Sequence, residues 1–222
     1  MGRGRLIVLE GIDGSGITTQ AQALGSWLSS QGHPVLVTKE PTCGPVGKLL
    51  RQALSGDLHL DEATVALLFA ADRHEHVSRE VLPALEQGIH VISDRYYLSS
   101  LAYQSSGLKA RWLAELNTHC PRPDLTVFLD VPSRVALARV HRRGAALEIY
   151  EQQDTLERVR SRYHGLIQAF SRAGDHVRVV DGADAPSEVT GRLARLAGDL
   201  LSTPATLPAT LRDLDVDWEG WQ

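Results

Sequence analysis

Short apolar runs alternate with longer amphipathic stretches along most of the chain, and this alternation constrains the fold more than any other feature of the sequence. The runs are uniformly apolar, as strands buried on both faces of a parallel sheet should be, and they cover residues 6–9, 35–37, 90–92, 125–129 and 177–180. Helical patterns fill residues 18–30, 61–87, 133–143 and 154–173. Strict alternation implies right-handed crossovers that cover both sides of the sheet. The sequence therefore predicts a three-layer α/β fold with a five-stranded parallel sheet and helices on both faces.

Polar residues follow the first four runs, at the point where each predicted strand ends. They are Glu10 to Asp13, Lys39 with Glu40, Asp94 with Arg95, and Asp130. Ligands of such sheets bind outside the carboxyl ends of the strands. We therefore expect the functional site at this edge of the sheet.

The bulk composition narrows the class of ligand. With 43% hydrophobic residues, 23% charged residues and a net charge of -4, the chain has neither the basic excess of a nucleic-acid binder nor a membrane signature. Cys43 and Cys120 form no disulfide framework, which fits a cytoplasmic location. Small-molecule chemistry is the default expectation.

The length of 222 residues suits one domain, which we place at residues 1–201. From residue 202 the texture changes to prolines and then to an acidic, tryptophan-bearing end. We expect residues 202–222 to form an acidic C-terminal tail, either flexible or docked on the surface.

Glycines dominate the segment between the first apolar run and the helical pattern after it. Residues 11–18 read Gly-Ile-Asp-Gly-Ser-Gly-Ile-Thr. In this context a glycine-rich loop wraps its backbone N–H groups around phosphate oxygens at a helix N-terminus. The candidate ATP and phosphate contacts are Gly11, Ile12, Asp13, Gly14, Ser15, Gly16, Ile17, Thr18 and Thr19.

Position 17 departs from this motif. Such loops carry a lysine after the last glycine, and its ammonium contacts the terminal phosphates, whereas this chain has Ile17. The backbone cradle does not depend on that side chain. Losing a donor aimed at developing charge typically costs about 10²- to 10³-fold in rate. The sequence thus predicts phosphate binding, with catalysis that is either slow or absent.

A second chemical element lies at the end of the run at residues 90–92. Asp94 ends a predicted strand, the arrangement that places a carboxylate beside the metal of a phosphate-loop enzyme, and Arg95 follows it. We expect Thr18 and Asp94 to hold Mg²⁺ and Arg95 to bridge donor and acceptor phosphates. Taken alone, an Asp-Arg pair would also fit a surface ion pair.

The segment around Arg95 carries a resemblance to a known family. Residues 93–104 read Ser-Asp-Arg-Tyr-Tyr-Leu-Ser-Ser-Leu-Ala-Tyr-Gln, which resembles the signature of bacterial thymidylate kinases. Residues 68–73 resemble the family's base-stacking helix, and residues 39–41 resemble its Arg-Glu-Pro strand end. The matches run in order over about residues 5–200. The resemblance implies a P-loop nucleoside monophosphate kinase fold, ATP and dTMP as substrates, Mg²⁺ as cofactor, and a homodimer.

Carried over residue by residue, the resemblance also implies an acceptor site. An aromatic ring would stack on thymine, polar side chains would bond the base edge, a tyrosine would pack under the deoxyribose, and arginines would hold the phosphate. The implied dTMP contacts are Asp13, Glu40, Arg51, Phe69, Arg73, Arg95, Ser100, Tyr103 and Gln104.

In this family an arginine-bearing lid closes over the phosphates. In this chain the corresponding segment is residues 140–152, approximately. Arg142 and Arg143 are the candidate lid arginines, and with Asp94 and Arg95 they form the candidate catalytic set. Ile149 stands where the family has an arginine, so a second expected cation is replaced. Residues 42–44, Thr-Cys-Gly, also depart from the usual Gly-Gly-Thr or Gly-Gly-Ser.

Two functions of different classes remain open from the sequence. One is ATP-dependent phosphorylation of dTMP to dTDP, slowed by the missing lysine. The other is a catalytically inactive nucleotide-binding or sensor protein that keeps the acceptor pocket. A kinase for another nucleoside monophosphate fits the implied base contacts less well.

Overall fold

A computed structural model describes residues 2–143, 152–204 and 209–218 of the chain. Its five strands form one parallel sheet in the order β2-β3-β1-β4-β5. The strands are β1 (Leu6–Glu10), β2 (Val35–Lys39), β3 (His90–Asp94), β4 (Leu125–Asp130) and β5 (Val177–Asp181). Each of the five apolar runs lies in one of them, so the predicted fold class is confirmed.

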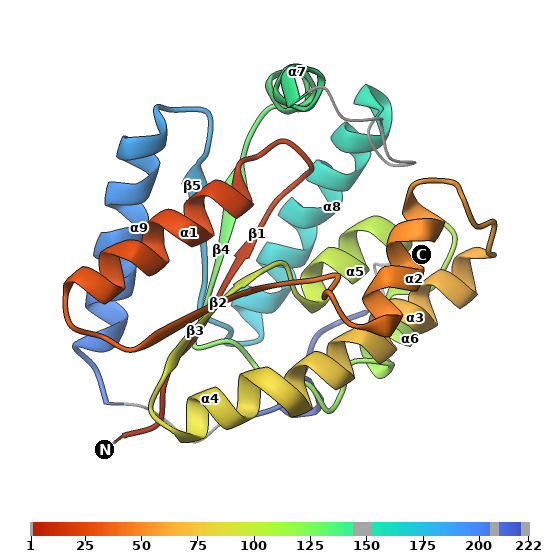
Figure 1. The fold of residues 1–222 in the computed structure, drawn as a ribbon. Helices are drawn as coiled ribbons and strands as arrows, with labels where there is room; N and C mark the ends of the chain where they lie inside the picture. The colour runs from red at the N-terminus through yellow and green to blue at the C-terminus, as the bar shows by residue number, and fades with distance from the viewer. Residues whose placement is uncertain (1, 144–151, 205–208, 219–222) are drawn as a thin grey trace.

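Helices cover both faces of this sheet (Figure 1). On one face lie α1 (Ile17–Ser30) and α9 (Pro186–Leu201), and on the other lie α4 (Leu82–Glu86), α5 (Tyr97–Gln104) and α8 (Gln153–Arg172). The remaining helical segments are α2 (Pro45–Leu54), α3 (Glu62–His76), the π-helical turn η1 (Val77–Val81), α6 (Ala110–Glu115), α7 (Ser133–Arg143) and the 3₁₀ turn η2 (Leu211–Asp213). The helical pattern expected over residues 61–87 corresponds to α3, η1 and α4 in succession.

Strand β1 shows why its run is apolar throughout. Ile7 and Leu9 belong to the core cluster shared with α1 and α9, whereas Leu6 and Val8 belong to the cluster on the opposite face. Alternate side chains of a strand point to opposite faces, so a central strand covered on both sides must be apolar at every position.

The outer strands are less buried than their apolar runs suggested. Along β5, Arg178 and Val179 are exposed, and four of the five residues of β2 are only partly buried. The strand order explains this difference, because β2 and β5 lie at the two edges of the sheet.

The segment after residue 202 packs on the domain where the structure describes it. Leu211, Leu214 and Val216 are buried in the main core cluster, and the Trp218 ring meets Phe170 of α8 edge-on at 6.1 Å between centroids. Thr210 forms an isolated antiparallel bridge with Pro121. Residues 209–218 therefore contribute apolar side chains to the domain expected at residues 1–201. None of the described helices is long and apolar enough to cross a membrane.

Candidate active site

The loop after β1 leads into the N-terminus of α1 at the carboxyl edge of the sheet. Gly14 and Gly16 have φ of 84° and 94°, a left-handed conformation that glycine adopts without steric cost. A Cβ atom at Gly14 would also come within 2.2 Å of the Ala136 carbonyl oxygen of α7. Helix α1 has no side-chain cap at Gly16, and its first N–H groups have no intrahelical partner. The loop thus offers open N–H groups and a positive helix end to an anion.

The side chain of Ile17 belongs to the core rather than to this cradle. It is 4% exposed and joins the apolar cluster that includes Leu9, Leu24 and Ile92. Its β-branched chain has no donor, so α1 supplies backbone N–H groups but no ammonium to a bound phosphate.

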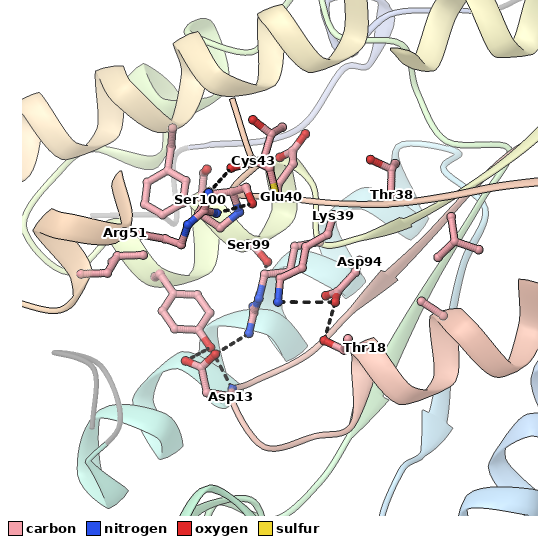
Figure 2. Close-up of a pocket in the computed structure, with 18 of the residues that line it drawn as sticks. Asp13, Thr18, Thr38, Lys39, Glu40, Cys43, Arg51, Asp94, Ser99 and Ser100 are labelled. Atoms are coloured by element: carbon pink, nitrogen blue, oxygen red, sulfur yellow. Dashed lines mark hydrogen bonds and ion pairs between the residues drawn. The ribbon is translucent and has the colours of Figure 1, made fainter. Parts of the chain in front are cut away.

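Thr18 and Asp94 lie together, as their predicted metal-binding role requires. The Thr18 hydroxyl donates to the Asp94 carboxylate at 2.5 Å, and Asp94 is only 3% exposed (Figure 2). Among the described residues, no group of three or more His, Cys, Asp and Glu side chains is arranged to hold a metal ion. A hydroxyl and a single carboxylate fit Mg²⁺, which typically takes one or two protein oxygens and completes its shell with phosphate and water.

Arg95 is held in a rigid position between the phosphate loop and α5. Its guanidinium pairs with Asp13 at 2.6 Å and donates to the Gly11 carbonyl at 2.9 Å and to the Ser99 hydroxyl at 3.1 Å. Its carbon Cζ lies 5.2 Å from the ring centroid of Tyr103. Although burial disfavours its charge, Tyr103 and Asp13 raise the pKa of Arg95 well above its ordinary value. The site therefore contains a permanent cation.

The backbone of Arg95 has a left-handed conformation, like that of Gly14 and Gly16 in the loop. With φ of 74°, it is the one residue other than glycine with a positive φ in the described part of the chain. A left-handed conformation costs a non-glycine residue about 1–2 kcal/mol, and such residues cluster at functional sites. The Tyr103 hydroxyl donates to Asp13 at 2.9 Å and accepts from its backbone N–H at 3.0 Å. Arg95, Asp13 and Tyr103 thus form one connected unit.

Glu10 is connected to this unit through Ser99, and it was not among the predicted site residues. It is fully buried at the end of β1 and accepts hydrogen bonds from the backbone N–H groups of Tyr96 and Ser99 and from the hydroxyls of Ser99 and Tyr163. Burial raises the pKa of Glu10 to about 7, against the hydrogen bonds from Ser99 and Tyr163. A polar residue directly after a buried strand was the available signal, but sequence alone did not show which backbone groups it would bind.

A cleft of about 640 Å³ extends from the phosphate loop between β2, α2, α3 and α5. Eight of the nine residues predicted to contact dTMP line it, together with others from the loop and β2. These eight are Asp13, Glu40, Arg51, Phe69, Arg95, Ser100, Tyr103 and Gln104. The structure therefore brings eight of the nine residues to one cavity.

Arg73 is the ninth, and it lies behind the cleft wall. It is 1% exposed, and its guanidinium pairs with Glu40 at 2.8 Å and donates to Asn117 at 2.7 Å, to the Tyr96 carbonyl at 3.2 Å and to the Ser100 hydroxyl at 3.0 Å. Four of its five N–H donors are thus engaged. Through Ser100 and Glu40, Arg73 orients two groups that do line the cleft.

His76 completes the network behind Glu40. Its ring nitrogens lie 3.0 Å from the Glu40 carboxylate and 2.8 Å from the Thr38 hydroxyl. Arg51 is also fixed, since its two terminal nitrogens donate to the carbonyls of Pro41 and Thr42 at 3.0 and 2.6 Å. Glu40 and Arg51 are therefore both held in position by contacts within the protein.

The candidate lid residues are placed less completely. The Arg142 side chain is exposed and donates to the Ala138 carbonyl of its own helix at 3.3 Å, so it does not line the cleft. The side chain of Arg143 and residues 144–151, which include Ile149, lie outside the described residues. Arg139 contacts the loop instead, through the Ser15 carbonyl at 3.4 Å.

Asp130, the fourth polar strand end, turns away from this cavity. Its carboxylate pairs with Arg160 of α8 at 2.6 Å. The other three polar strand ends converge on the cleft, whereas β4 contributes its aspartate to packing with α8.

Comparisons with known proteins agree with this geometry. The family model described as thymidylate kinase matches residues 9–189. A probable thymidylate kinase of Pyrococcus horikoshii is 47% identical over 174 residues, which cover 76% of this chain and 85% of the relative. One from Pyrococcus abyssi is 44% identical over 193 residues, covering 84% and 92%. A thymidylate kinase of Xanthomonas oryzae is 47% identical over 186 residues, covering 83% and 79%.

Proposed function

The chain belongs to the thymidylate kinase family, and from this premise we propose that it transfers the γ-phosphoryl group of ATP to dTMP. An oxygen of the dTMP phosphate attacks the γ-phosphorus, and the bond to the β–γ bridging oxygen breaks with its electron pair leaving on ADP. The products are dTDP and ADP, and charge is conserved without a proton transfer. The enzyme is a nucleoside monophosphate kinase, and hence a transferase.

The arrangement around Arg95 is the observation that carries this proposal. Its guanidinium is fixed by Asp13 of the phosphate loop and lines the cleft that Phe69 and Ser100 line on the acceptor side. A cation at the junction of the two sites can grip the acceptor phosphate and stabilise charge on the group in transit. Such transfer depends chiefly on positioning and charge neutralisation.

The other cleft residues take roles that their positions support. Phe69 offers an aromatic face to thymine, Ser100 and Gln104 bond the base edge, and Arg51 assists Arg95 at the acceptor phosphate. Tyr103, locked to Asp13, packs under the deoxyribose. When Mg²⁺ is bound, Thr18 and Asp94 are the residues that would hold it, and it supplies charge neutralisation to the phosphates. The loop N–H groups bind the phosphates of ATP.

We expect the purified protein to bind dTMP with a dissociation constant on the order of micromolar, and dCMP or dGMP at least about tenfold more weakly. The reason is that the eight cleft residues are pre-organised whatever the rate of catalysis. Isothermal titration calorimetry with each monophosphate measures this preference. Equal affinity for all three would remove the basis for a thymine pocket.

A coupled assay with dTMP, ATP and Mg²⁺, run beside that calorimetry, separates the kinase from a silent binder. The missing lysine at position 17 favours a second candidate function, that of an inactive nucleotide sensor. Tight binding of dTMP and ATP with formation of dTDP supports the kinase. Tight binding of both with no dTDP after prolonged incubation would favour the sensor.

We further propose that the enzyme acts as a homodimer in the cytoplasm. Leu49 of α2 and Leu67 of α3 are 38% and 49% exposed, on two helices that pack against each other, and they would gain by burial against a second copy. Both Cys43 and Cys120 are free thiols, as a reducing compartment maintains them.

The molar mass of the parent protein, measured by light scattering after size-exclusion chromatography, should be about twice the chain mass. The Leu67→Glu variant should have the mass of one chain. A parent that elutes as a single chain at all concentrations contradicts the dimer.

A further inference from the structure

The phosphate loop has a cradle of N–H groups but lacks its ammonium. Isoleucine has no hydrogen-bond donor, and the Ile17 side chain is buried in the apolar cluster under the loop. A polyphosphate bound here would still carry several negative charges close together. Some other cation must reach them if transfer proceeds at a useful rate.

Lys39 approaches the loop from the other side of the cleft. It is the last residue of β2, in register with Asp94 on the neighbouring strand β3. Its Nζ atom lies 3.9 Å from Asp94 Oδ2, the same oxygen that accepts from Thr18 of α1. Figure 2 shows the Lys39 side chain extending from β2 toward Asp94 and Thr18. The ammonium therefore ends close to the residues that begin α1.

The contact between Lys39 and Asp94 is loose enough to be exchanged. The lysine side chain is 56% exposed, and an N···O distance of 3.9 Å lies at the outer limit of an ion pair. Asp94 is buried, but its carboxylate also accepts the hydrogen bond from Thr18, so it keeps a partner when the lysine moves away. A lysine ammonium is a compact charge on a flexible stem. Moving from Asp94 to a phosphate oxygen would cost little.

Three arginines near the loop are each held by several contacts, and in the proposed function Arg51 and Arg95 bind the acceptor phosphate. Within the described ranges, each forms hydrogen bonds to the protein that fix its guanidinium: Arg51 to the carbonyls of Pro41 and Thr42, Arg95 to Asp13, Gly11 and Ser99, and Arg139 to the carbonyls of Ser15, Gly182 and Ala183. Lys39 is the cation lining the cleft that makes a single contact, and that contact is longer than a hydrogen bond.

We propose that Lys39 supplies the ammonium that position 17 lacks, by binding the terminal phosphates of ATP from the β2 side. This inference rests on the proposed kinase function for its catalytic part, in which Lys39 neutralises charge on the phosphoryl group during transfer. Its binding part stands apart from catalysis, because an ammonium beside the phosphates also strengthens ATP binding.

The test is Lys39→Gln, which removes the charge and keeps most of the stem. We expect the single-turnover rate of dTDP formation to fall at least about tenfold, less than for a buried donor because Lys39 is half-exposed. ATP affinity, measured by calorimetry with EDTA so that no metal takes part, should fall about fivefold or more, whereas dTMP affinity should change less than about twofold. Lys109→Gln, an equal change of charge at an exposed lysine that precedes α6, is the matched control and should leave all three quantities at parent values.

The outcomes distinguish this inference from the proposed function. If Lys39→Gln leaves both ATP affinity and the transfer rate of an active parent unchanged, the assignment of Lys39 is wrong and the kinase stands. If the parent forms no dTDP but Lys39→Gln still weakens ATP binding, the kinase fails and Lys39 remains a phosphate ligand. Lys39→Arg should keep the ATP affinity within about threefold of the parent, and a loss as large as that of Lys39→Gln would contradict a role for charge.

Discussion

The Arg95→Ala variant should lose phosphoryl transfer to dTMP, with a rate at least about 10³-fold below that of the parent. It should also bind dTMP about 10- to 100-fold more weakly, since a charge-assisted grip on phosphate is worth about 1.5–3 kcal/mol. The expected effect is large because Arg95 touches both sides of the reaction. Its removal also leaves the Asp13 carboxylate without the partner now 2.6 Å away.

Single-turnover kinetics and calorimetry measure the two effects separately. Arg111→Ala is the matched control, because Arg111 is 76% exposed and its partner Glu115 lies one turn away on α6. It should behave as the parent. Arg95→Gly removes the same side chain while relieving the φ of 74°, so it shows whether any loss comes from misfolding. An Arg95→Gly protein that folds and binds dTMP as tightly as the parent would reduce Arg95 to a structural ion pair.

The sequence predicted the parts of the site that depend on strand ends and on the glycine loop. Thr18 and Asp94 lie in contact, because a loop after β1 and the end of adjacent β3 must meet at one edge of a parallel sheet. Asp13 and Arg95 meet for the same reason. These contacts follow from topology, and alternation of strands and helices determines topology strongly.

Side-chain direction could not be predicted in the same way. Arg73 was expected at the base, but it lies behind the wall in a network with Glu40 and Asn117, which are 33 and 44 residues away in sequence. Asp130 sits at a strand end like Asp94, yet it pairs with Arg160. Which partner a charged group finds depends on the packing of helices whose mutual positions no local pattern specifies.

The lid shows a third limit. Arg142 was expected among the catalytic residues from its place before Gly144, but among the described residues its side chain donates to the Ala138 carbonyl of its own helix. A lid arginine must be ordered at each turnover, which costs conformational entropy. Its catalytic role stays a prediction, whereas three cationic side chains, Lys39, Arg51 and Arg95, already line the cleft. A residue on a strand is held in place more firmly than one on a closing segment.

Restoring a lysine at position 17 should produce the second large effect, and its size should depend on Lys39. The loop has left-handed glycines and an uncapped start of α1, which suit it to bind phosphate, so an ammonium from α1 would find the phosphates in place. In a Lys39→Gln background, Ile17→Lys should raise the single-turnover rate about 10²-fold or more, because it returns a donor that acts chiefly in the transition state. In the parent the gain should be only about tenfold, since Lys39 already does part of this work.

The four variants form a double-mutant cycle, and the coupling between positions 17 and 39 is the quantity that decides the matter. A lysine at position 17 has to leave the apolar cluster that the Ile17 side chain occupies and direct its ammonium to the loop, because a buried unpaired charge is costly. Thermal unfolding of each variant measures what this change costs the fold. Equal gains from Ile17→Lys in both backgrounds would mean that the two positions act independently and that Lys39 does not substitute for the missing lysine. If all four variants bind dTMP and ATP yet none forms dTDP, the chain is a binder that keeps the acceptor cleft of a kinase, because restoring the absent charge would then have failed to restore the chemistry.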